Sequence, residues 1–284
     1  MTQPRMTVRF AAVTHPGLVR PDNEDACLAV PPVFLVADGM GGHEGGERAS
    51  GEVRRRFQES CAGEWLSGAE ITRIVRRAAD NIESLEHRGR PPGSTVAGVA
   101  LARYAGTPCW LVFNIGDSRT YLVADGEIRR LTRDHSLLQE AKDRGERDAD
   151  SSDPPDADTL AVAPNVVTRA LGAGGRGLPE PDYAVAPLHG GDRLILCSDG
   201  VHGVVPDRDL VRAVEDSTHP QAAANALVDL AIALGTQDNA TAVVVEVTVA
   251  AHSRTTPPGA AHREVRAARP ATVRTARRRH EGED

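Results

Sequence analysis

The sequence predicts an α+β fold built around antiparallel sheets. Apolar runs typical of strands follow one another in succession, and the steady strand–helix alternation of a parallel sheet is absent. Two long helical patterns stand together after the first strands. The dipeptide Asp125-Gly126 also separates two strand-like segments, which is a strong signal for a β-hairpin. These three observations favour strands paired with their sequence neighbours and helices grouped apart from them.

Short apolar runs predict the buried strands. The clearest are Val33–Ala37, Trp110–Ile115, Leu194–Cys197 and Ala242–Val247. Further strands are expected at Val8–Thr14, Thr95–Tyr104, Arg119–Ala124 and Glu127–Leu131, of which the last two form the hairpin. Because aromatic residues make up only 3% of the chain, the core must consist mainly of Val, Leu, Ile and Ala.

Amphipathic spacing predicts three helices. The first covers Glu47–Cys61, and the last begins at Pro220 and ends at Gly235. Between them, Ser67 and Glu70 have the spacing of a capping box at a helix start. The apolar residues of this middle helix fall on one face: Ile71, Ile74, Val75, Ala78, Ile82 and Leu85.

The 284 residues are expected to form one large domain over 1–250, with a loop insertion at about 140–166. Within that insertion, Asp143–Asp158 is rich in acids and contains Pro154-Pro155, which predicts an exposed, mobile loop. Residues 251–284 are rich in Arg, Ala and Pro, which predicts a disordered tail. We favour a solvated, dispensable tail over one that binds an acidic partner, a membrane surface or the acidic body of the same protein through Arg277-Arg278-Arg279.

The charge of the chain is unevenly distributed. The net charge is −7, and the tail from Ala251 carries +4, which leaves −11 for the remainder. An acidic body argues against a nucleic-acid-binding face and suits a protein that gathers metal cations.

The cysteines and the N-terminus indicate a cytoplasmic protein. Four scattered cysteines, without a CxxC pair, predict reduced thiols: Cys27, Cys61, Cys109 and Cys197. Met1–Thr7 lacks the apolar core of a secretory signal, and no apolar stretch has the length of a membrane span. We expect a monomer in the cytoplasm.

Acidic residues cluster at the ends of the predicted strands. Asp38, Asp117 and Asp199 each follow a strand, whereas Asp238 precedes one. In an antiparallel sheet the end of one strand adjoins the start of its neighbour, so these four acids can converge at one rim. Any single Asp-Gly pair is more simply explained as turn chemistry, but several on one rim are not.

Converging carboxylates repel one another and lose solvation, so they require either protons or a cation. Ligation by oxygen alone selects hard cations such as Mg²⁺ or Mn²⁺. A glycine such as Gly39 lets its backbone carbonyl approach a metal closely.

Eight segments in this order resemble the metal-dependent PP2C-type (PPM) serine/threonine protein phosphatases of bacteria, over about residues 8–248. They are Arg20-Pro-Asp-Asn-Glu-Asp-Ala26, Asp38-Gly-Met-Gly-Gly-His43, Gly93-Ser-Thr95, Asn114-Ile-Gly-Asp-Ser-Arg119, Leu131-Thr-Arg-Asp-His-Ser136, Thr168-Arg-Ala-Leu-Gly172, Ser198-Asp-Gly200 and Asp238-Asn-Ala-Thr241. The resemblance implies a sandwich of two antiparallel sheets flanked by helix pairs. It also implies hydrolysis of phosphoserine and phosphothreonine in proteins, in opposition to a Ser/Thr kinase.

The same resemblance implies roles for particular residues. Asp38 would bridge two Mn²⁺ or Mg²⁺ ions, the Gly39 carbonyl would bind the second, and Asp199 and Asp238 would complete the first. Glu24 and Asp25 match acids that hold metal-bound waters. Asp117 matches the ligand of a third, weaker metal, and Arg20 matches the arginine that binds phosphate.

Physical chemistry is consistent with these roles. Two cations about 4 Å apart can share a water and lower its pKa, and the fork of Arg20 can grip two phosphoryl oxygens. No protein nucleophile is required, so Cys197 and Ser198 need not take part. Met40 stands where many eukaryotic relatives have a histidine proposed as the general acid. A thioether cannot donate that proton and His43 is a weak candidate, so the proton donor stays unassigned.

Other readings of the sequence fit less well. Glu44 occupies the position where a nucleotide-binding GxGxxG needs its third glycine, and no GxSxG of a serine hydrolase occurs. His135 and His202 lack metal-binding spacing and are expected to be structural. A phosphatase-like module that only binds partners would not need Asp38, Asp199 and Asp238 together. A manganese-dependent assay separates that alternative from an enzyme.

Overall fold

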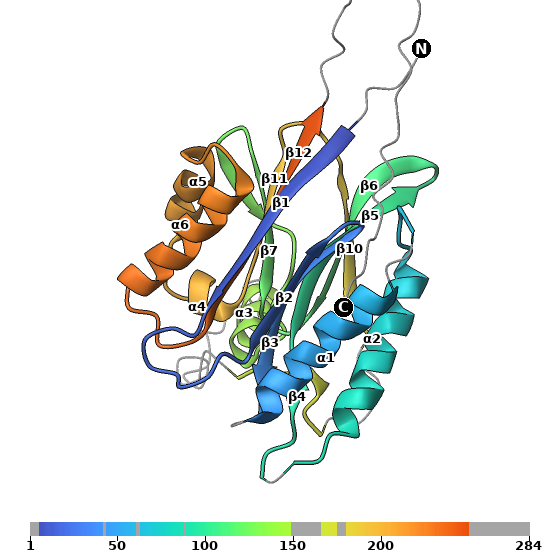
Figure 1. The fold of residues 1–284 in the computed structure, drawn as a ribbon, viewed down its shortest axis with the longest axis vertical. Coiled ribbons are helices and arrows are strands. Elements are labelled where there is room, and N and C mark those ends of the chain that lie inside the picture. The colour runs from blue at the N-terminus through green and yellow to red at the C-terminus, as the bar shows by residue number, and fades with distance from the viewer. Residues whose placement is uncertain are drawn as a thin grey trace, which may run out of the picture. The chain divides into compact units, whose positions relative to one another are not determined.

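The computed structural model of the chain describes residues 6–41, 44–60, 63–87, 89–148, 166–174 and 180–249. Two antiparallel β-sheets stack face to face, and helices cover the outer face of each sheet (Figure 1). The predicted α+β fold with a central sandwich is therefore confirmed. The described helices and strands all lie within 1–250, and the predicted tail over 251–284 lies outside the described residues.

The first sheet contains five strands, beginning with the pair formed by the two ends of the domain. Their spatial order is β1 (Met6–His15), β12 (Ala240–Val249), β11 (Arg193–Cys197), β7 (Arg119–Ala124) and β8 (Glu127–Arg130). Strands β7 and β8 form the predicted hairpin, and its turn residues Asp125 and Gly126 have φ of 52° and 78°. Positive φ at both positions identifies the two-residue turn that Asp-Gly favours.

The second sheet contains seven strands. Six follow the order β10 (Asp182–Pro187), β6 (Thr107–Ile115), β5 (Val96–Tyr104), β3 (Val33–Met40), β4 (Gly93–Ser94) and β9 (Leu171–Gly172). The seventh, β2 (Asp25–Val30), pairs with β3. Strand β3 therefore lies inside the sheet, with β2 on one side and β4 and β5 on the other.

Alternating side chains divide the core into three layers. In β11, Leu194 and Leu196 pack between the sheets with Phe34 and Trp110, whereas Ile195 faces the outer helices. Neighbouring residues of a strand point to opposite faces, so a fully apolar strand can serve two layers at once. This explains why the inner strands read as continuous apolar runs.

Four helices form the outer layers (Figure 1). Helices α1 (Glu44–Ser60) and α2 (Gly68–Glu83) cover the second sheet, and α5 (Asp207–Glu215) and α6 (Pro220–Ala233) cover the first. The predicted capping box of α2 is present, with Ser67 N donating to Glu70 Oε2 at 2.8 Å. On α1, Phe57 stacks on Phe113 of β6 with ring centroids 5.2 Å apart. Burying one such side chain contributes about 1.5–3 kcal/mol.

The structure describes two further helices, and one of them corrects the sequence prediction. The short α4 (Asp199–His202) follows β11, and α3 covers Leu137–Asp148. The loop predicted over Asp143–Asp158 is therefore wrong for its first six residues, which are helical, and residues 149–158 lie outside the described part. The helix propensity of the arginines and the glutamate in this stretch outweighed its acidity. Among the described residues, no helix is long and apolar enough to cross a membrane.

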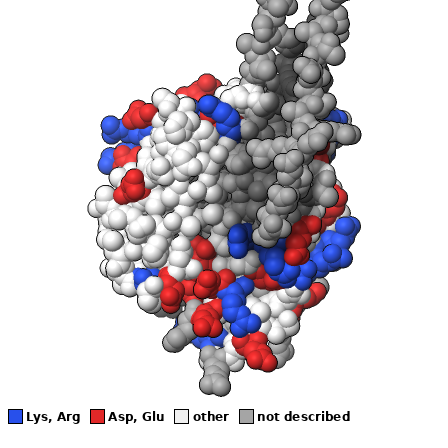
Figure 2. All heavy atoms as spheres, viewed as in Figure 1, with Lys and Arg blue, Asp and Glu red and all other residues white. Residues whose placement is uncertain are grey.

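Charged side chains are unevenly spread over the face seen in Figure 2. The surface over α6 is mainly uncharged, and the sequence of this helix contains a single charged residue, Asp229. Acidic and basic side chains gather instead over α1 and at the end of the sandwich where α4 and the β1–β2 connection lie. That end carries the candidate site.

Candidate metal centre

The pairing of β2 with β3 places two acids side by side. Asp25, at the start of β2, is the direct cross-strand partner of Asp38 in β3. Like charges in opposite positions of an antiparallel pair destabilise the sheet. Removal from water raises the pKa of Asp25 to about 7 and that of Asp38 well above its ordinary value. The nearby charges of Asp25 and Asp199 raise the pKa of Asp38 further.

The backbone around Asp38 is held from both sides. Asp38 N donates to Thr95 Oγ1 at 2.9 Å, and Thr95 N donates to Asp38 O at 2.9 Å. Gly39 N donates to Glu24 O at 3.1 Å. A Cβ on Gly39 would lie 2.2 Å from the carbonyl oxygen of Gly46, so only glycine lets the start of α1 approach this strand.

Two more acids arrive from the other sheet. Asp199 begins α4 directly after β11, and Asp238 lies just before β12. A Cβ on Gly200 would lie 1.9 Å from the backbone oxygen of Asn239, so glycine permits the close approach of these two segments. Burial, followed by the charge of Asp238, raises the pKa of Asp199.

Hydrogen bonds join the two sheets at this point. Ser198 Oγ donates to Asp25 Oδ2 at 2.8 Å and accepts from Thr241 N at 3.1 Å. The acids therefore meet at one end of the sandwich and come from both sheets, whereas the strand pattern alone indicated the rim of a single sheet. The side chain of Ser198 links the strands and need not serve as a nucleophile.

Asn239 organises the loop that carries the other candidate residues. Its Oδ1 accepts from Glu24 N at 2.8 Å, and its Nδ2 donates to Pro16 O and Asp22 O, both at 2.9 Å. Sequence reasoning assigned Asn239, Thr95 and Ser198 no role in the site. Their positions inside the matching segments were the only signal that could have identified them.

Arg20 lies at the entrance of the site. Its Nη2 donates to Asp238 Oδ2 at 2.6 Å, and half of its side chain, 51%, is exposed. The hydrogen bond to Asp238 raises the pKa of the guanidinium. An arginine with its remaining N–H groups open to solvent can bind an anion that enters beside the carboxylates.

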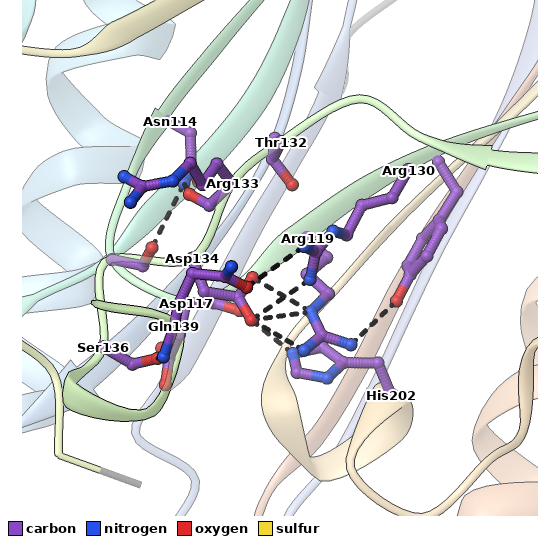
Figure 3. A network of polar contacts seen from close by, with 12 residues as sticks. Asn114, Asp117, Arg119, Arg130, Thr132, Arg133, Asp134, Ser136, Gln139 and His202 are labelled. Carbon is purple, nitrogen blue, oxygen red and sulfur yellow. Dashed lines mark hydrogen bonds and ion pairs between the residues drawn. The ribbon is translucent and has the colours of Figure 1, made fainter. Parts of the chain in front are cut away.

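Asp117 reaches the same site from the connection between β6 and β7. Burial, followed by the charge of Asp199, raises the pKa of Asp117 to about 7. His202 lies beside it, and burial lowers the pKa of this imidazole to about 3, so the ring is neutral. Figure 3 shows Asp117 and His202 next to the ion pair of Arg119 with Asp134.

A cavity of about 910 Å³ opens onto these side chains. Its walls include Arg20, Asp117, Asp199 and Asp238, together with Lys142 of α3. Within the described part of the chain, Met40 is not among the residues that line it, and neither are Glu24, Asp25 and Asp38. His43 lies outside the described residues, so its candidacy as a proton donor stays a prediction.

The donor set fits a hard divalent cation. Glu24 Oε1 and Asp199 Oδ1 are buried and have no hydrogen-bond partner, which is costly for a carboxylate unless a cation or water meets it. Every candidate ligand atom is an oxygen, as Mg²⁺ and Mn²⁺ prefer. Among the described residues, no three Asp, Glu, His or Cys side chains lie close enough together to hold one metal ion by themselves. Asp238 is turned toward Arg20, and backbone and water oxygens would have to complete the ligand set.

Comparisons with known proteins agree with the arrangement. The family model described as Protein phosphatase 2C matches residues 24–240. The serine/threonine protein phosphatase PstP of Mycobacterium tuberculosis is 32% identical over 266 residues, which cover 90% of this chain and 48% of that protein. The serine/threonine phosphatase stp of Listeria monocytogenes is 30% identical over 82% of this chain and 93% of its own length. The chain thus spans about half the length of the first relatives that it matches.

Solved structures show the same fold. The catalytic domain of PstP in complex with two manganese ions has a TM-score of 0.73 and 30% identity, over 86% of this chain and all of that one. The PPM Ser-Thr phosphatase MsPP from Mycobacterium smegmatis, in complex with cacodylate, has a TM-score of 0.68 and 30% identity over 84% and 97% of the two chains. The chain therefore belongs to the protein phosphatase 2C family.

Proposed function

We propose that this protein is a metal-dependent phosphatase that hydrolyses phosphoserine and phosphothreonine in proteins. One observation carries the proposal: carboxylates from both sheets meet at one end of the sandwich, and two of them, Glu24 and Asp199, have buried oxygens without a partner. Of these two acids, Asp199 lines the cavity together with Arg20. The names of the related proteins and membership of the family support this substrate class.

The proposal assigns Mn²⁺ or Mg²⁺ to the acidic end of the sandwich. Asp38, the Gly39 carbonyl, Asp199 and Asp238 would hold two ions, and Asp117 would hold a third. Glu24 and Asp25 would orient bound waters. Such ions lower the pKa of a water and stabilise negative charge on phosphoryl oxygens. Support comes from the oxygen-only donor set and from the solved structure of a relative that contains two manganese ions.

Residues of the chain would perform the remaining tasks. Arg20 already donates one N–H to Asp238, so its other N–H groups are available to orient a phosphoryl group beside the acids. Asp25 is held by Ser198 in a fixed orientation. The Met40 thioether has no proton to transfer, and we assign no side chain as donor to the leaving serine or threonine oxygen.

The decisive experiment measures hydrolysis of p-nitrophenyl phosphate and of phosphothreonine peptides by the full chain. We expect turnover with Mn²⁺ or Mg²⁺, none after EDTA, and recovery when metal is restored. Asp38→Asn should remove turnover, whereas Asp125→Asn in the distant hairpin should retain it, because asparagine tolerates positive φ. Wild-type protein without metal-dependent turnover would contradict the enzyme and favour a binding module.

The cellular setting is part of the same proposal. We place the protein in the cytoplasm, in signalling, as a monomer that opposes a Ser/Thr protein kinase. Three described cysteines, Cys27, Cys109 and Cys197, are free thiols, which suits a reducing compartment. Comparing the phosphoproteome after treatment with wild type and with Asp38→Asn would identify the substrates, and sedimentation would test the monomer.

A further inference from the structure

His202 connects two parts of the candidate metal centre. It lies on α4, three residues after Asp199, and its Nε2 is 3.0 Å from the backbone oxygen of Asp117. A carbonyl oxygen only accepts hydrogen bonds, so Nε2 must carry the hydrogen and donate it. This nitrogen is therefore occupied, which leaves it neither as a metal ligand nor as a proton donor to substrate.

The turn that carries Asp117 is held from its other side by His135. Gly116 has φ of 103°, a conformation that favours glycine. Gly116 N donates to His135 Nδ1 at 3.0 Å, and His135 N donates to Gly116 O at 2.9 Å. Asn114 Nδ2 adds a bond to Gly116 O at 3.1 Å. Residues of β6 and of the loop after β8 thus fix Gly116. The backbone oxygen of the next residue, Asp117, accepts the hydrogen bond from His202.

The charged residues next to His202 pair with one another and not with its imidazole, which donates to the Asp117 oxygen. Arg119 directs Nε and Nη2 to Asp134 at distances of 2.6–3.2 Å, and Arg130 reaches the same carboxylate at 3.3 Å. These charges satisfy one another next to His202 (Figure 3). The side chain of His202 lines the cavity together with Asp117 and Asp199.

We propose that His202 is a positioning residue that fixes Asp117 relative to Asp199, and that the weakest cation position of the site depends on it. The inference rests on the proposed function, because it assumes that Asp117 is a ligand. Without the bond, the buried Asp117 oxygen would lose its partner, or the turn would rotate and carry the carboxylate away. Outer partners of metal ligands change metal affinity by about 10–100-fold when removed.

The test is direct binding of Mn²⁺ to the full chain, followed by the electron paramagnetic resonance signal of the free ion. We expect wild type to bind one weak ion in addition to tighter ones. His202→Leu should weaken the weak ion about 10-fold and leave the tighter ones within about twofold. His202→Gln, which keeps an N–H donor, should recover much of the affinity. His87→Leu is the matched control, since His87 Nδ1 lies 3.2 Å from the backbone oxygen of Leu85 and His87 is not among the residues that line the cavity.

Repeating the substitution of His202 in a variant that lacks the Asp117 carboxylate separates a positioning role from a general structural role. Asp117→Asn should abolish the weak ion, and adding His202→Leu to it should change the remaining binding by less than twofold. Unchanged weak binding in His202→Leu, or equal weakening of all ions, would overturn the inference. If the leucine variant does not fold, His202→Asn, whose amide is too short to reach the carbonyl, carries the same expectation.

The two proposals can fail separately. Wild type that binds no Mn²⁺ overturns both. Wild type that binds Mn²⁺ and hydrolyses phosphopeptides, while His202→Leu binds every ion normally, overturns only the role of His202.

Discussion

Two groups of carboxylates, each with one member in the wall of the cavity, have different partners. Asp134 accepts hydrogen bonds from Arg119 and Arg130, and Asp182 accepts from Arg169 at 2.6 Å and lies 3.1 Å from His135. We call these two acids the paired group. Among the described residues, Asp25, Asp38 and Asp199 form no ion pair with an arginine or histidine, and their charges act on one another. We call these three acids the unpaired group.

The pKa of Asp182 moves in the opposite direction to those of the unpaired group. Hydrogen bonds from Arg169 and His135 outweigh burial and lower the pKa of Asp182. Burial and mutual repulsion raise the pKa of every acid in the unpaired group. The chain contains 32 arginines and one lysine, yet none of those that the structure describes forms an ion pair with Asp25, Asp38 or Asp199, and Arg20 at the entrance pairs with Asp238. This difference supports the proposal that the unpaired group receives a cation from outside the chain.

The largest expected effect is on turnover. Asp38→Asn should reduce kcat more than 100-fold with Mn²⁺, because the central carboxylate is lost. The same change should leave the melting temperature of the metal-free protein equal or higher, since it removes a repulsive charge. Residual turnover above a tenth of wild type in steady-state assays would contradict the assignment, and Asp238→Asn carries the same expectation.

The paired group should respond in the opposite way. Asp134→Asn leaves Arg119, which is largely buried, without its carboxylate, and should lower the free energy of unfolding by about 3 kcal/mol. Urea denaturation of the metal-free protein measures this loss. If Asp134→Asn lowered the free energy of unfolding by less than Asp38→Asn does, the distinction between the two groups would be lost.

The pH dependence of stability follows from the raised pKa values. Asp25 and Asp117 have a pKa of about 7 in the folded protein against an ordinary value near 3.8. The folded state therefore binds more protons between pH 4 and 7, so stability falls as pH rises through this window. In EDTA, we expect a lower melting temperature at pH 8 than at pH 5.5.

Two comparisons sharpen this pH prediction. Asp25→Asn should flatten the slope, and saturating Mn²⁺ should raise the melting temperature more at pH 8 than at pH 5.5. Asp182, whose pKa is lowered, contributes stability that is lost only at more acidic pH, as the carboxylate protonates. A metal-free protein that is more stable at pH 8 would refute the repulsion.

The smallest expected effect concerns Arg20. Arg20→Ala should raise KM for phosphopeptides several-fold and change kcat less, because an exposed arginine contributes mainly to binding the phosphoryl group. Phosphopeptide kinetics at saturating Mn²⁺ give the two constants separately. An unchanged KM would remove the phosphate-binding role from Arg20.

Much of the fold could be predicted from local patterns. The inner strands were found because their side chains are apolar on both faces, and α2 was found from its capping box and apolar stripe. Edge strand β10 was missed, since Tyr183 and Val185 are exposed and it ends in proline. Helix α5 was missed because nine residues contain too few turns for a clear period.

Some residues of the candidate site could likewise be predicted from local sequence, and others could not. Short segments around Asp38, Asp117, Asp199 and Asp238 could be read along the chain, because each contains its own strand end and turn residues. Asn239, Ser198 and His202 could not, since each acts through a backbone atom or carboxylate more than 40 residues away. Sequence spacing carries no information about such partners.

By itself, the sequence determined the inner strands, helices α1, α2 and α6, and which acids stand at strand ends, since burial period and turn chemistry are local. Only the tertiary structure decided that acids from two sheets meet at one end of the sandwich. It also decided which carboxylates obtain an arginine and which are left to repel one another. The physical reason is that electrostatic energy depends on distance and burial, and both are properties of the packed chain.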